Sequence, residues 1–239
     1  MKNSINLKFL MIDRRFRIPR IWSNHELKKF AHLFEGDIVN VSGWQDKDKE
    51  GDEYKNYFKN KKSYTITNYK PEACGYQGMD GELFLNLEDD LPEELVNKFD
   101  LVFNHTVLEH VFEIEKAFQN LCLMSKDVII IVIPFLQEMH TSYGDFWRMT
   151  PLALKRMFDK NNCHLQYLTF NGHRNASVYL FAIAVKDRNK WENILPSFIQ
   201  EKEPDAYEQE NEKQAGCNAV YNRWYKALQL FGRIFLRNK

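Results

Sequence analysis

Residues 99–133 read FDLVFNHTVLEHVFEIEKAFQNLCLMSKDVIIIVI, and this stretch decides the fold. Its two ends, 99–103 and 128–133, are apolar runs without alternation, which is typical of strands covered on both faces of a parallel sheet. Between them, apolar side chains recur near helical spacing over residues 107–124. That spacing predicts a crossover helix that returns the chain to the sheet. The stretch therefore predicts one strand–helix–strand unit.

Weaker patterns extend this unit in both directions. Upstream, strands are predicted at 37–41 and 64–67, with an acidic loop at 43–53 and a short helix around 54–59 between them. Downstream, a helix is predicted over 151–158, because Pro151 occupies a favoured first helical position. Strands predicted at 164–170 and 178–185 flank a polar turn at 171–175 and could close the sheet as an antiparallel pair.

The two ends of the chain differ from this central region. We expect an N-terminal helical segment at 1–36, an α/β domain at 37–186, and a C-terminal segment at 187–239. The last segment contains an acidic stretch at 201–212 and a basic amphipathic stretch at 224–236. An amphipathic helix there would pack on the domain, form a homodimer contact, or lie peripherally on an anionic membrane surface.

Composition limits the classes of partner. Lys and Arg together number 33, as do Asp and Glu, so no basic excess indicates a nucleic-acid partner. The four cysteines are far apart and form no CxxC pair, which favours reduced thiols and indicates neither a zinc site nor a disulfide framework. No apolar run reaches the roughly 18 residues of a membrane span. We therefore expect a cytoplasmic protein without a transmembrane segment or a metal site.

Polar residues follow each predicted parallel strand. In an open α/β sheet, ligands bind beyond the carboxyl ends of the strands, where the strand order reverses. Candidate ligand-binding residues therefore lie just after the strands: Asn40, Ser42, Gly43, Asn68, Asn86, Leu87, Asn104 and His105.

Three segments carry a resemblance to a known family. They are FDLVFNHTVLEHV at 99–111, VIIIVIPFLQEMH at 128–140, and GDFWRMTPLALKRMF at 144–158. Their order and spacing resemble class I S-adenosylmethionine-dependent methyltransferases of the methyltransferase type 11 group, and the resemblance covers residues 37–185. Members of that group carry a VLEH helix start, a fifth strand ending in VP or IP, and an H…HDYWRFTPEGL segment.

The resemblance implies a Rossmann-like, three-layer α/β/α fold. Its sheet would be mostly parallel and seven-stranded, with an antiparallel last strand. S-adenosylmethionine would bind across the ends of the first, second and fourth strands, and S-adenosylhomocysteine would be the product.

The first half of the chain departs from the family pattern. Where the family has an acid followed by GxG, the run is Asn40, Val41, Ser42, Gly43, Trp44. Asn68 stands where the family places an acid for the ribose hydroxyls, and Asn86 before Leu87 stands where an Asp lies near the adenine. Each lost charge-assisted hydrogen bond costs about 1.5–3 kcal/mol, so two losses cut affinity by about two to four decades. Carboxylates of the loop at 43–53 could compensate.

The segment after the fifth strand supplies the expected chemistry. His140 is the expected general base, because imidazole titrates near neutral pH, and its alternative role is to brace the loop. Asp145 and Arg148 are expected at the substrate or as a structural ion pair, and Trp147 as a substrate platform or a core residue. Arg17 belongs to a cluster with Arg14, Arg15 and Arg20. That cluster would meet an anionic substrate or form a solvated helix face.

The expected function is S-adenosylmethionine-dependent methylation of a small hydroxyl- or amine-bearing metabolite. A sugar or surface-glycan precursor is the acceptor suggested by analogy with type 11 relatives. Two alternatives remain open: a catalytically inactive methyltransferase-like binding or scaffold protein, favoured by Trp44 in a glycine position, and a protein that binds a different nucleotide-like ligand.

Overall fold

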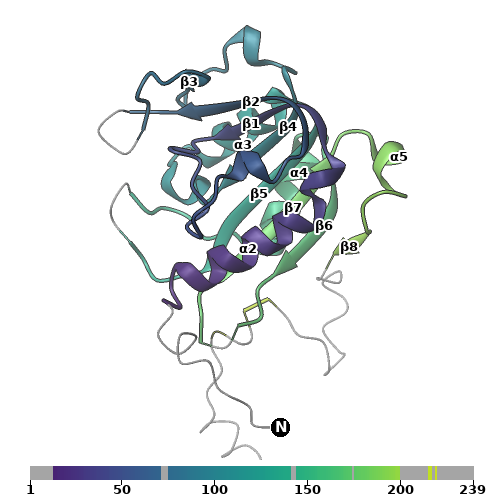
Figure 1. Ribbon diagram of the computed structural model, residues 1–239. Coiled ribbons are helices and arrows are strands. Elements are labelled where there is room, and N and C mark those ends of the chain that lie inside the picture. Colours follow the sequence, from purple (N-terminus) through teal and green to yellow (C-terminus); the bar gives the residue numbers. More distant parts are fainter. Residues whose placement is uncertain are drawn as a thin grey trace, which may run out of the picture.

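The protein contains one mixed sheet, seen in a computed structural model that describes residues 13–70, 75–140, 144–173 and 175–199, with 215, 216 and 219. Eight strands lie in the order β3-β2-β1-β4-β5-β7-β6-β8 (Figure 1). Their bounds are β1 Glu35–Val41, β2 Asn60–Asn68, β3 Glu82–Phe84, β4 Phe99–His105, β5 Ser125–Leu136, β6 His164–Phe170, β7 Val178–Val185 and β8 Phe198–Ile199.

The strand directions confirm the predicted fold class. All pairs from β3 through β5 are parallel, whereas β7 runs antiparallel to both β5 and β6. The expected seven strands are therefore present, and the two-residue β8 extends the sheet beyond β6. The chain runs outward from β1 to β3 and returns to β4 on the other side of β1, so the strand order reverses between β1 and β4. In such sheets that point is where ligands bind.

Both faces of the sheet are covered, as continuous apolar strands require. Along β5, Ile129 and Ile131 pack on one side and Ile130 and Val132 on the other, because successive side chains of a strand point to opposite faces. Helix α2 (Arg17–Phe30) lies across one face (Figure 1), and α3 (Ile114–Met124) and α4 (Pro151–Lys160) cover the other. The three layers are those predicted.

The predicted helix at 107–124 is shorter and interrupted. A 3-10 turn, η5 (Leu108–His110), precedes a break, and α3 starts only at Ile114. The reason lies outside the segment. The carboxylate of Glu88 accepts the N–H groups of Phe112 and Glu113, the two residues before α3, at 3.0 and 3.1 Å, and so binds the backbone of the break.

The crossover between β1 and β2 contains no α-helix. The short helix predicted around 54–59 is only a 3-10 turn, η2 (Tyr54–Asn56), and β2 begins earlier than predicted. The side chains of Tyr54, Tyr57 and Phe58 are buried in the core on the α2 side of the sheet. An irregular segment with buried aromatic rings thus covers the sheet where a helix would otherwise lie.

The remaining short elements are η1 (Ala31–Leu33), η4 (Glu93–Leu95) and α5 (Arg188–Trp191). Cys122 and Cys163 are free, buried thiols. The acidic stretch at 201–212 and the amphipathic helix predicted at 224–236 lie outside the described residues, so the homodimer and membrane-contact predictions stay predictions. The cytoplasmic location also stays a prediction.

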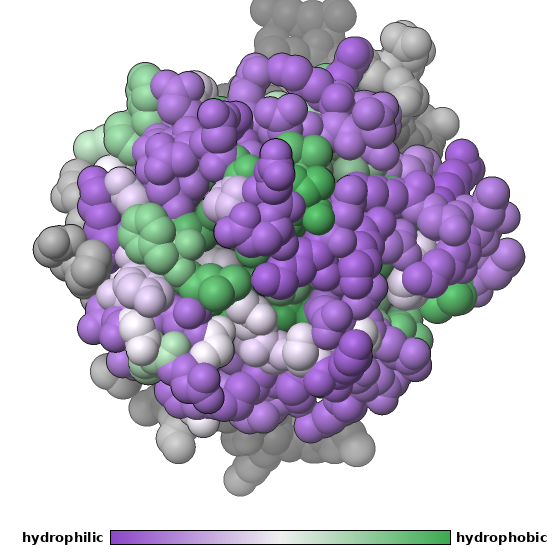
Figure 2. Space-filling model, turned by 90° about the horizontal axis from the view of Figure 1, so that it is seen from above, coloured by the Kyte–Doolittle hydropathy of each residue, from purple (hydrophilic) through white to green (hydrophobic). Residues whose placement is uncertain are grey.

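One face of the molecule is mainly polar. Figure 2 shows hydrophilic side chains over most of one face, with apolar side chains in small patches between them. Within the described residues, no helix has the length and apolar character that a membrane crossing needs.

Candidate functional site

The loop after β1 packs on itself. The side-chain amide of Asn40 donates to Asp46 Oδ1 at 2.7 Å, and a Cβ added to Gly43 would lie 2.5 Å from Asn40 Nδ2. The glycine therefore leaves room for the Asn40 side chain. Ser42, whose φ is 57°, places its backbone N–H 3.2 Å from Thr67 Oγ1. These three predicted cofactor residues lie together, but their polar groups face neighbouring protein atoms.

Asn68 is held in the same way at the end of β2. Its oxygen accepts the backbone N–H of Trp44 at 2.7 Å, and its amide nitrogen donates to the Trp44 carbonyl at 3.2 Å and to Glu82 Oε1 at 2.6 Å. An amide nitrogen has two hydrogens, so both are engaged. Asn68 can hold ribose hydroxyls, as predicted, only if contacts to Trp44 or Glu82 break.

The carboxylates of the β1–β2 loop are likewise engaged. Asp46 accepts hydrogen bonds from the Tyr64 hydroxyl and the Lys55 backbone, and burial raises its pKa. Asp48, fully buried, accepts the Tyr57 hydroxyl at 2.6 Å and three backbone N–H groups of its own turn. These two carboxylates stabilise the loop and do not supply the missing cofactor charge.

The segment after β3 forms a turn. Asn86 accepts the backbone N–H of Glu88 at 3.2 Å, and the side chain of Leu87 is buried in the core. The carbonyl of Leu87 accepts the side-chain amide of Asn120 at 2.9 Å. Of these two predicted residues, Asn86 retains a partly accessible side chain.

The end of β4 is different, because it holds buried polar atoms without partners. Asn104 is fully buried; its Nδ2 donates to the Val41 carbonyl at 3.1 Å, but no described residue donates to its Oδ1. A buried carbonyl oxygen without a partner costs about 1–3 kcal/mol, so such groups usually mark a missing water or ligand. Asn104 lies between β1 and β5, at the point where the strand order reverses.

His105 lies in a chain of hydrogen bonds that starts on α2. Its Nε2 is 2.9 Å from Ser23 Oγ and its Nδ1 is 3.1 Å from Thr106 Oγ1. The Ser23 hydroxyl donates its one hydrogen to the Arg20 carbonyl, so Nε2 must donate to Ser23, and Nδ1 accepts from Thr106. Burial, and then the charge of Arg20, hold the pKa of His105 well below its usual value. The ring is therefore neutral, with both nitrogens engaged.

Arg20 reaches the same edge with donors to spare. One of its terminal nitrogens donates to Thr106 Oγ1 at 2.8 Å, and no carboxylate of the described residues pairs with it. Arg17, one turn earlier on α2, is exposed. Of these two arginines, only Arg20 contacts the carboxyl edge of the sheet.

Glu109 is the buried acid of this edge. Its side chain is 1% exposed, its Oε2 has no partner among the described residues, and its Oε1 lies 3.8 Å from His110 Nε2. Burial raises the pKa of Glu109 to about 7, which the charges of Arg20 and Arg148 only partly oppose. A carboxyl group that titrates near neutral pH can take up or release a proton during a reaction.

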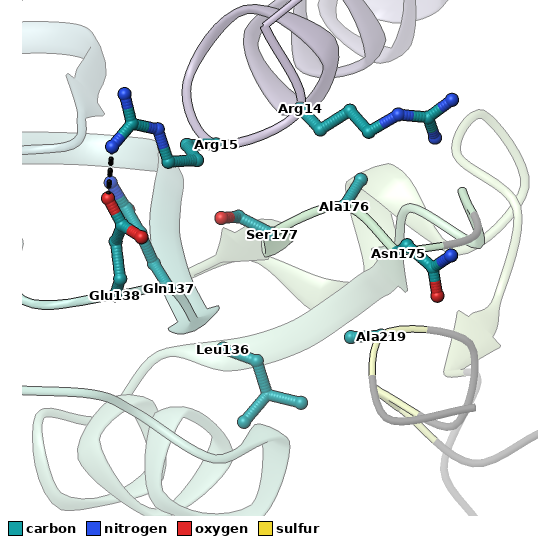
Figure 3. Close-up of a pocket in the computed structure, with 9 residues that line it drawn as sticks. All are labelled: Arg14, Arg15, Leu136, Gln137, Glu138, Asn175, Ala176, Ser177 and Ala219. Atoms are coloured by element: carbon teal, nitrogen blue, oxygen red, sulfur yellow. Dashed lines mark hydrogen bonds and ion pairs between the residues drawn. The ribbon is translucent and has the colours of Figure 1, made fainter. Parts of the chain in front are cut away.

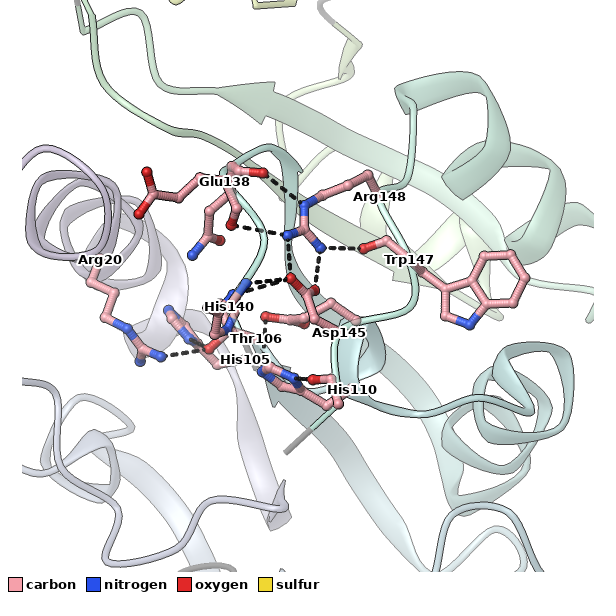
Figure 4. A network of polar contacts seen from close by, with 12 residues as sticks. Arg20, His105, Thr106, His110, Glu138, His140, Asp145, Trp147 and Arg148 are labelled. Atoms are coloured by element: carbon pink, nitrogen blue, oxygen red, sulfur yellow. Dashed lines mark hydrogen bonds and ion pairs between the residues drawn. The ribbon is translucent and has the colours of Figure 1, made fainter. Parts of the chain in front are cut away.

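The loop after β5 is tied together by an ion pair (Figure 4). Arg148 contacts both oxygens of Asp145, at 2.5 and 2.7 Å. This contact outweighs burial, which acts in the opposite direction, and lowers the pKa of Asp145 to about 2. Asp145 also accepts the His140 backbone N–H at 2.8 Å and lies 3.4 Å from His140 Nδ1. The His140 ring packs edge-on against His110, with centroids 4.8 Å apart.

Two cavities flank this loop. One, of about 260 Å³, is lined by Arg14, Arg15, Glu138 and Ser177, among others (Figure 3). The second, of about 230 Å³, is lined by Gln137, Met139, Asp145, Phe146, Trp147 and Arg148. The Trp147 side chain is 39% exposed there and is not a core residue.

Sequence reasoning missed Glu109 and Gln137 as site residues. Gln137 directly follows β5, and Glu109 lies four residues after the end of β4, which is a usable signal. Glu109, however, was assigned to a helix start, and the buried, unpartnered oxygens of both residues are visible only in three dimensions.

Known structures share this fold. A scan against models of protein families found no match, and a search of curated proteins found none. A Bacillus halodurans C-125 protein described as a candidate methyltransferase matches with a TM-score of 0.50 and 10% identity, over 68% of this chain and 97% of that one. Magnesium protoporphyrin IX methyltransferase from Synechocystis PCC 6803, solved with S-adenosylhomocysteine, matches at 0.45 and 10%, over 70% and 83%.

A third match has a similar extent. The 1,6-didemethyltoxoflavin-N1-methyltransferase of Burkholderia thailandensis, solved with its substrate and S-adenosylhomocysteine, gives a TM-score of 0.47 and 12% identity, over 70% of this chain and 80% of that one. At such identities the likeness shows the fold alone.

Proposed function

We propose that this protein binds S-adenosylmethionine and transfers its methyl group to a hydroxyl or amine of a small molecule. The fold shared with the Bacillus halodurans candidate methyltransferase supports the proposal. The observation that carries it is the unpartnered, fully buried Asn104 Oδ1 where the strand order reverses. A sugar or glycan precursor remains the acceptor we expect among hydroxyl compounds.

The β4 end of the sheet carries polar groups whose chemistry suits the amino-acid end of this donor. Arg20, which lacks an acidic partner, would hold the carboxylate. Asn104 Oδ1 and Glu109 Oε2, both buried acceptors without partners, would hold the ammonium group. When bound, S-adenosylmethionine supplies a methyl group on a positively charged sulfur. Because Asn68 is engaged by Trp44 and Glu82, we expect the nucleoside end to contribute less affinity than a carboxylate at that position would.

Two groups could accept the proton that the acceptor loses. His140 is the predicted base, and Asp145 lies 3.4 Å from its Nδ1, although the carboxylate and this nitrogen form no hydrogen bond. Glu109 is the second group, because its pKa of about 7 suits proton transfer near neutral pH. His140→Gln tests the first group: if His140 accepts the proton, turnover falls by roughly 100-fold or more while donor binding persists. Glu109→Gln also removes a group assigned to the donor's ammonium, so its turnover is compared with that of the unmodified protein at saturating donor.

A second function is favoured by the β1–β2 edge. There, Gly43 accommodates Asn40 and Asn68 binds Trp44, so the usual nucleoside side of the site is filled by the protein's own groups. A catalytically inactive binding protein would show this arrangement.

Calorimetric titration with S-adenosylmethionine and S-adenosylhomocysteine distinguishes the two functions. We expect binding, and we expect Arg20→Met to weaken it by about 10- to 100-fold, since a charge-assisted hydrogen bond is lost. Arg17→Met, on the same helix but exposed, is the matched control and should bind normally. If millimolar ligand produces neither heat nor thermal stabilisation, the protein is not a methyltransferase.

A further inference from the structure

The cavity of about 230 Å³ after β5 has two aromatic walls. Phe146 is 50% exposed and Trp147 39%, although folding usually removes such side chains from water. The cavity is smaller than the roughly 300–1,000 Å³ of pockets for drug-sized ligands, so it suits a single ring. None of its lining residues belongs to the group at the β4 end that we assign to the donor.

The aromatic walls are held in place by hydrogen bonds. The indole N–H of Trp147 donates to the Phe112 carbonyl at 3.1 Å, and the Phe146 ring packs edge-on against Phe112, with centroids 5.4 Å apart. The backbone N–H groups of Phe146 and Trp147 both point to the Glu109 carbonyl, at 2.8 and 3.4 Å. A surface fixed before binding loses little entropy when a ligand arrives. The Glu109 contacts also keep this surface beside the β4 end.

The cavity offers a ligand no free charge. All five N–H donors of Arg148 are engaged: two with Asp145, and three with the carbonyls of Gln137, Glu138 and Trp147. Asp145 is neutralised by the same contact. Although Arg148 lines the cavity, an anion placed there would find no available hydrogen on it.

Gln137, a residue that lines both cavities, has a side-chain oxygen that requires a donor. The side-chain oxygen of Gln137 is buried and has no partner among the described residues. A ligand hydroxyl or N–H that donates to it would remove the cost of leaving it unpaired.

We propose that this cavity is the acceptor subsite and binds an uncharged ring compound that carries a hydroxyl group. Its apolar face lies on Phe146 and Trp147, and a hydroxyl donates to Gln137 Oε1. The pyranose ring of a sugar and a phenol share this chemistry. The inference rests on the proposed function, because it assigns the molecule that would receive the methyl group.

Saturation-transfer NMR on the full chain, without methyl donor, tests the proposal. One arm uses methyl β-D-glucopyranoside and methyl β-D-galactopyranoside, and the other uses 4-methylphenol. Glucose 6-phosphate and 4-methylbenzoate are the charged counterparts. We expect at least one uncharged compound to bind, and we expect its charged counterpart to bind no more tightly. The arm that binds identifies the ring type.

Variants locate the binding. Trp147→Ala should weaken it by about 10-fold, the worth of one aromatic face. Gln137→Leu should weaken it by a similar factor, because the hydrogen-bond acceptor is lost. Phe84→Ala removes another exposed aromatic side chain, on β3 and away from the cavity, and should change nothing.

Three results would overturn the subsite. The first is that no uncharged compound binds at about 10 mM, a concentration at which even weak millimolar sites fill. The second is that Trp147→Ala binds as tightly as the unmodified protein, and the third is that the charged compounds bind more tightly than the uncharged ones. Because no donor is present, none of these results depends on the titration with S-adenosylmethionine. The two proposals can therefore fail separately.

Discussion

Replacing Glu109 by Gln should change how the stability of this protein depends on pH. The carboxyl group is 1% exposed, and burial raises its pKa from 4.5 to about 7. The charges of Arg20 and Arg148 lower this pKa, the charge of Asp145 raises it, and His110 lies nearby. In the folded protein Glu109 therefore holds its proton more tightly than in the unfolded chain.

The sign and size of the effect follow from proton linkage. Between pH 4.5 and about pH 7 the folded state binds more protons than the unfolded state. The contribution of Glu109 is thus fully present below pH 4.5 and is lost as the pH rises through 7. A difference from 4.5 to about 7, at about 1.36 kcal/mol per pH unit, amounts to about 3 kcal/mol in the free energy of unfolding. Glutamine does not titrate, so the variant lacks this loss.

Urea unfolding of both proteins at pH 5 and pH 8 measures the effect. We expect the free energy of unfolding of Glu109→Gln, relative to the unmodified protein, to rise by about 2–3 kcal/mol between these pH values. Any constant packing cost of the amide cancels in this comparison. Glu115→Gln, at a side chain that is 70% exposed, is the control and should show no such rise. If the difference in free energy of unfolding between Glu109→Gln and the unmodified protein is equal at the two pH values, the argument that Glu109 is protonated near neutral pH is refuted.

Three further predictions concern the loops at the carboxyl edge. Asn68→Asp restores the acid of the methyltransferase pattern, but it places two carboxylates together because Glu82 Oε1 lies 2.6 Å from the present amide nitrogen. We expect urea unfolding to show a free energy of unfolding that is about 2–4 kcal/mol lower at pH 8 and that recovers in acid. Asp145→Asn should destabilise the protein by about 2 kcal/mol above pH 4. Because the folded state lowers the pKa of Asp145 from 3.8 to about 2, this difference should shrink as the pH falls through that range, which acid titration followed by circular dichroism would measure. Gly43→Ala, whose Cβ would lie 2.5 Å from Asn40 Nδ2, should lower stability by about 1–3 kcal/mol relative to the unmodified protein in thermal unfolding.

Sequence patterns predicted the central elements well and the crossovers poorly. The strands at 99–103, 128–133, 164–170 and 178–185 are present as β4, β5, β6 and β7, because a run that is apolar on both faces has few other ways to be buried. The helix predicted at 107–124 was wrong at its start, since Glu88, distant in the chain, binds the backbone N–H groups of Phe112 and Glu113 in the break before α3. The spacing of residues within one segment cannot predict a partner from another part of the chain.

For the candidate site, too, the sequence predicted some features and missed others. Sequence position correctly brought Asn104 and His105 to the carboxyl edge, and it placed Asp145 beside Arg148. It could not tell that the polar groups of Asn68 are engaged. Nor could it tell that Asn104 retains an unpartnered oxygen, because both facts depend on neighbours that only folding supplies.

The amino-acid sequence by itself determined that this chain builds a mostly parallel α/β sheet. Hydrophobic periodicity is a local property, and burial of such strands on both faces leaves little choice of architecture. Tertiary structure alone decided which polar side chains remain available to a ligand. Hydrogen bonds and desolvation act between atoms brought together from distant parts of the chain, so Asn68 is engaged while Asn104 and Glu109 keep buried oxygens without partners.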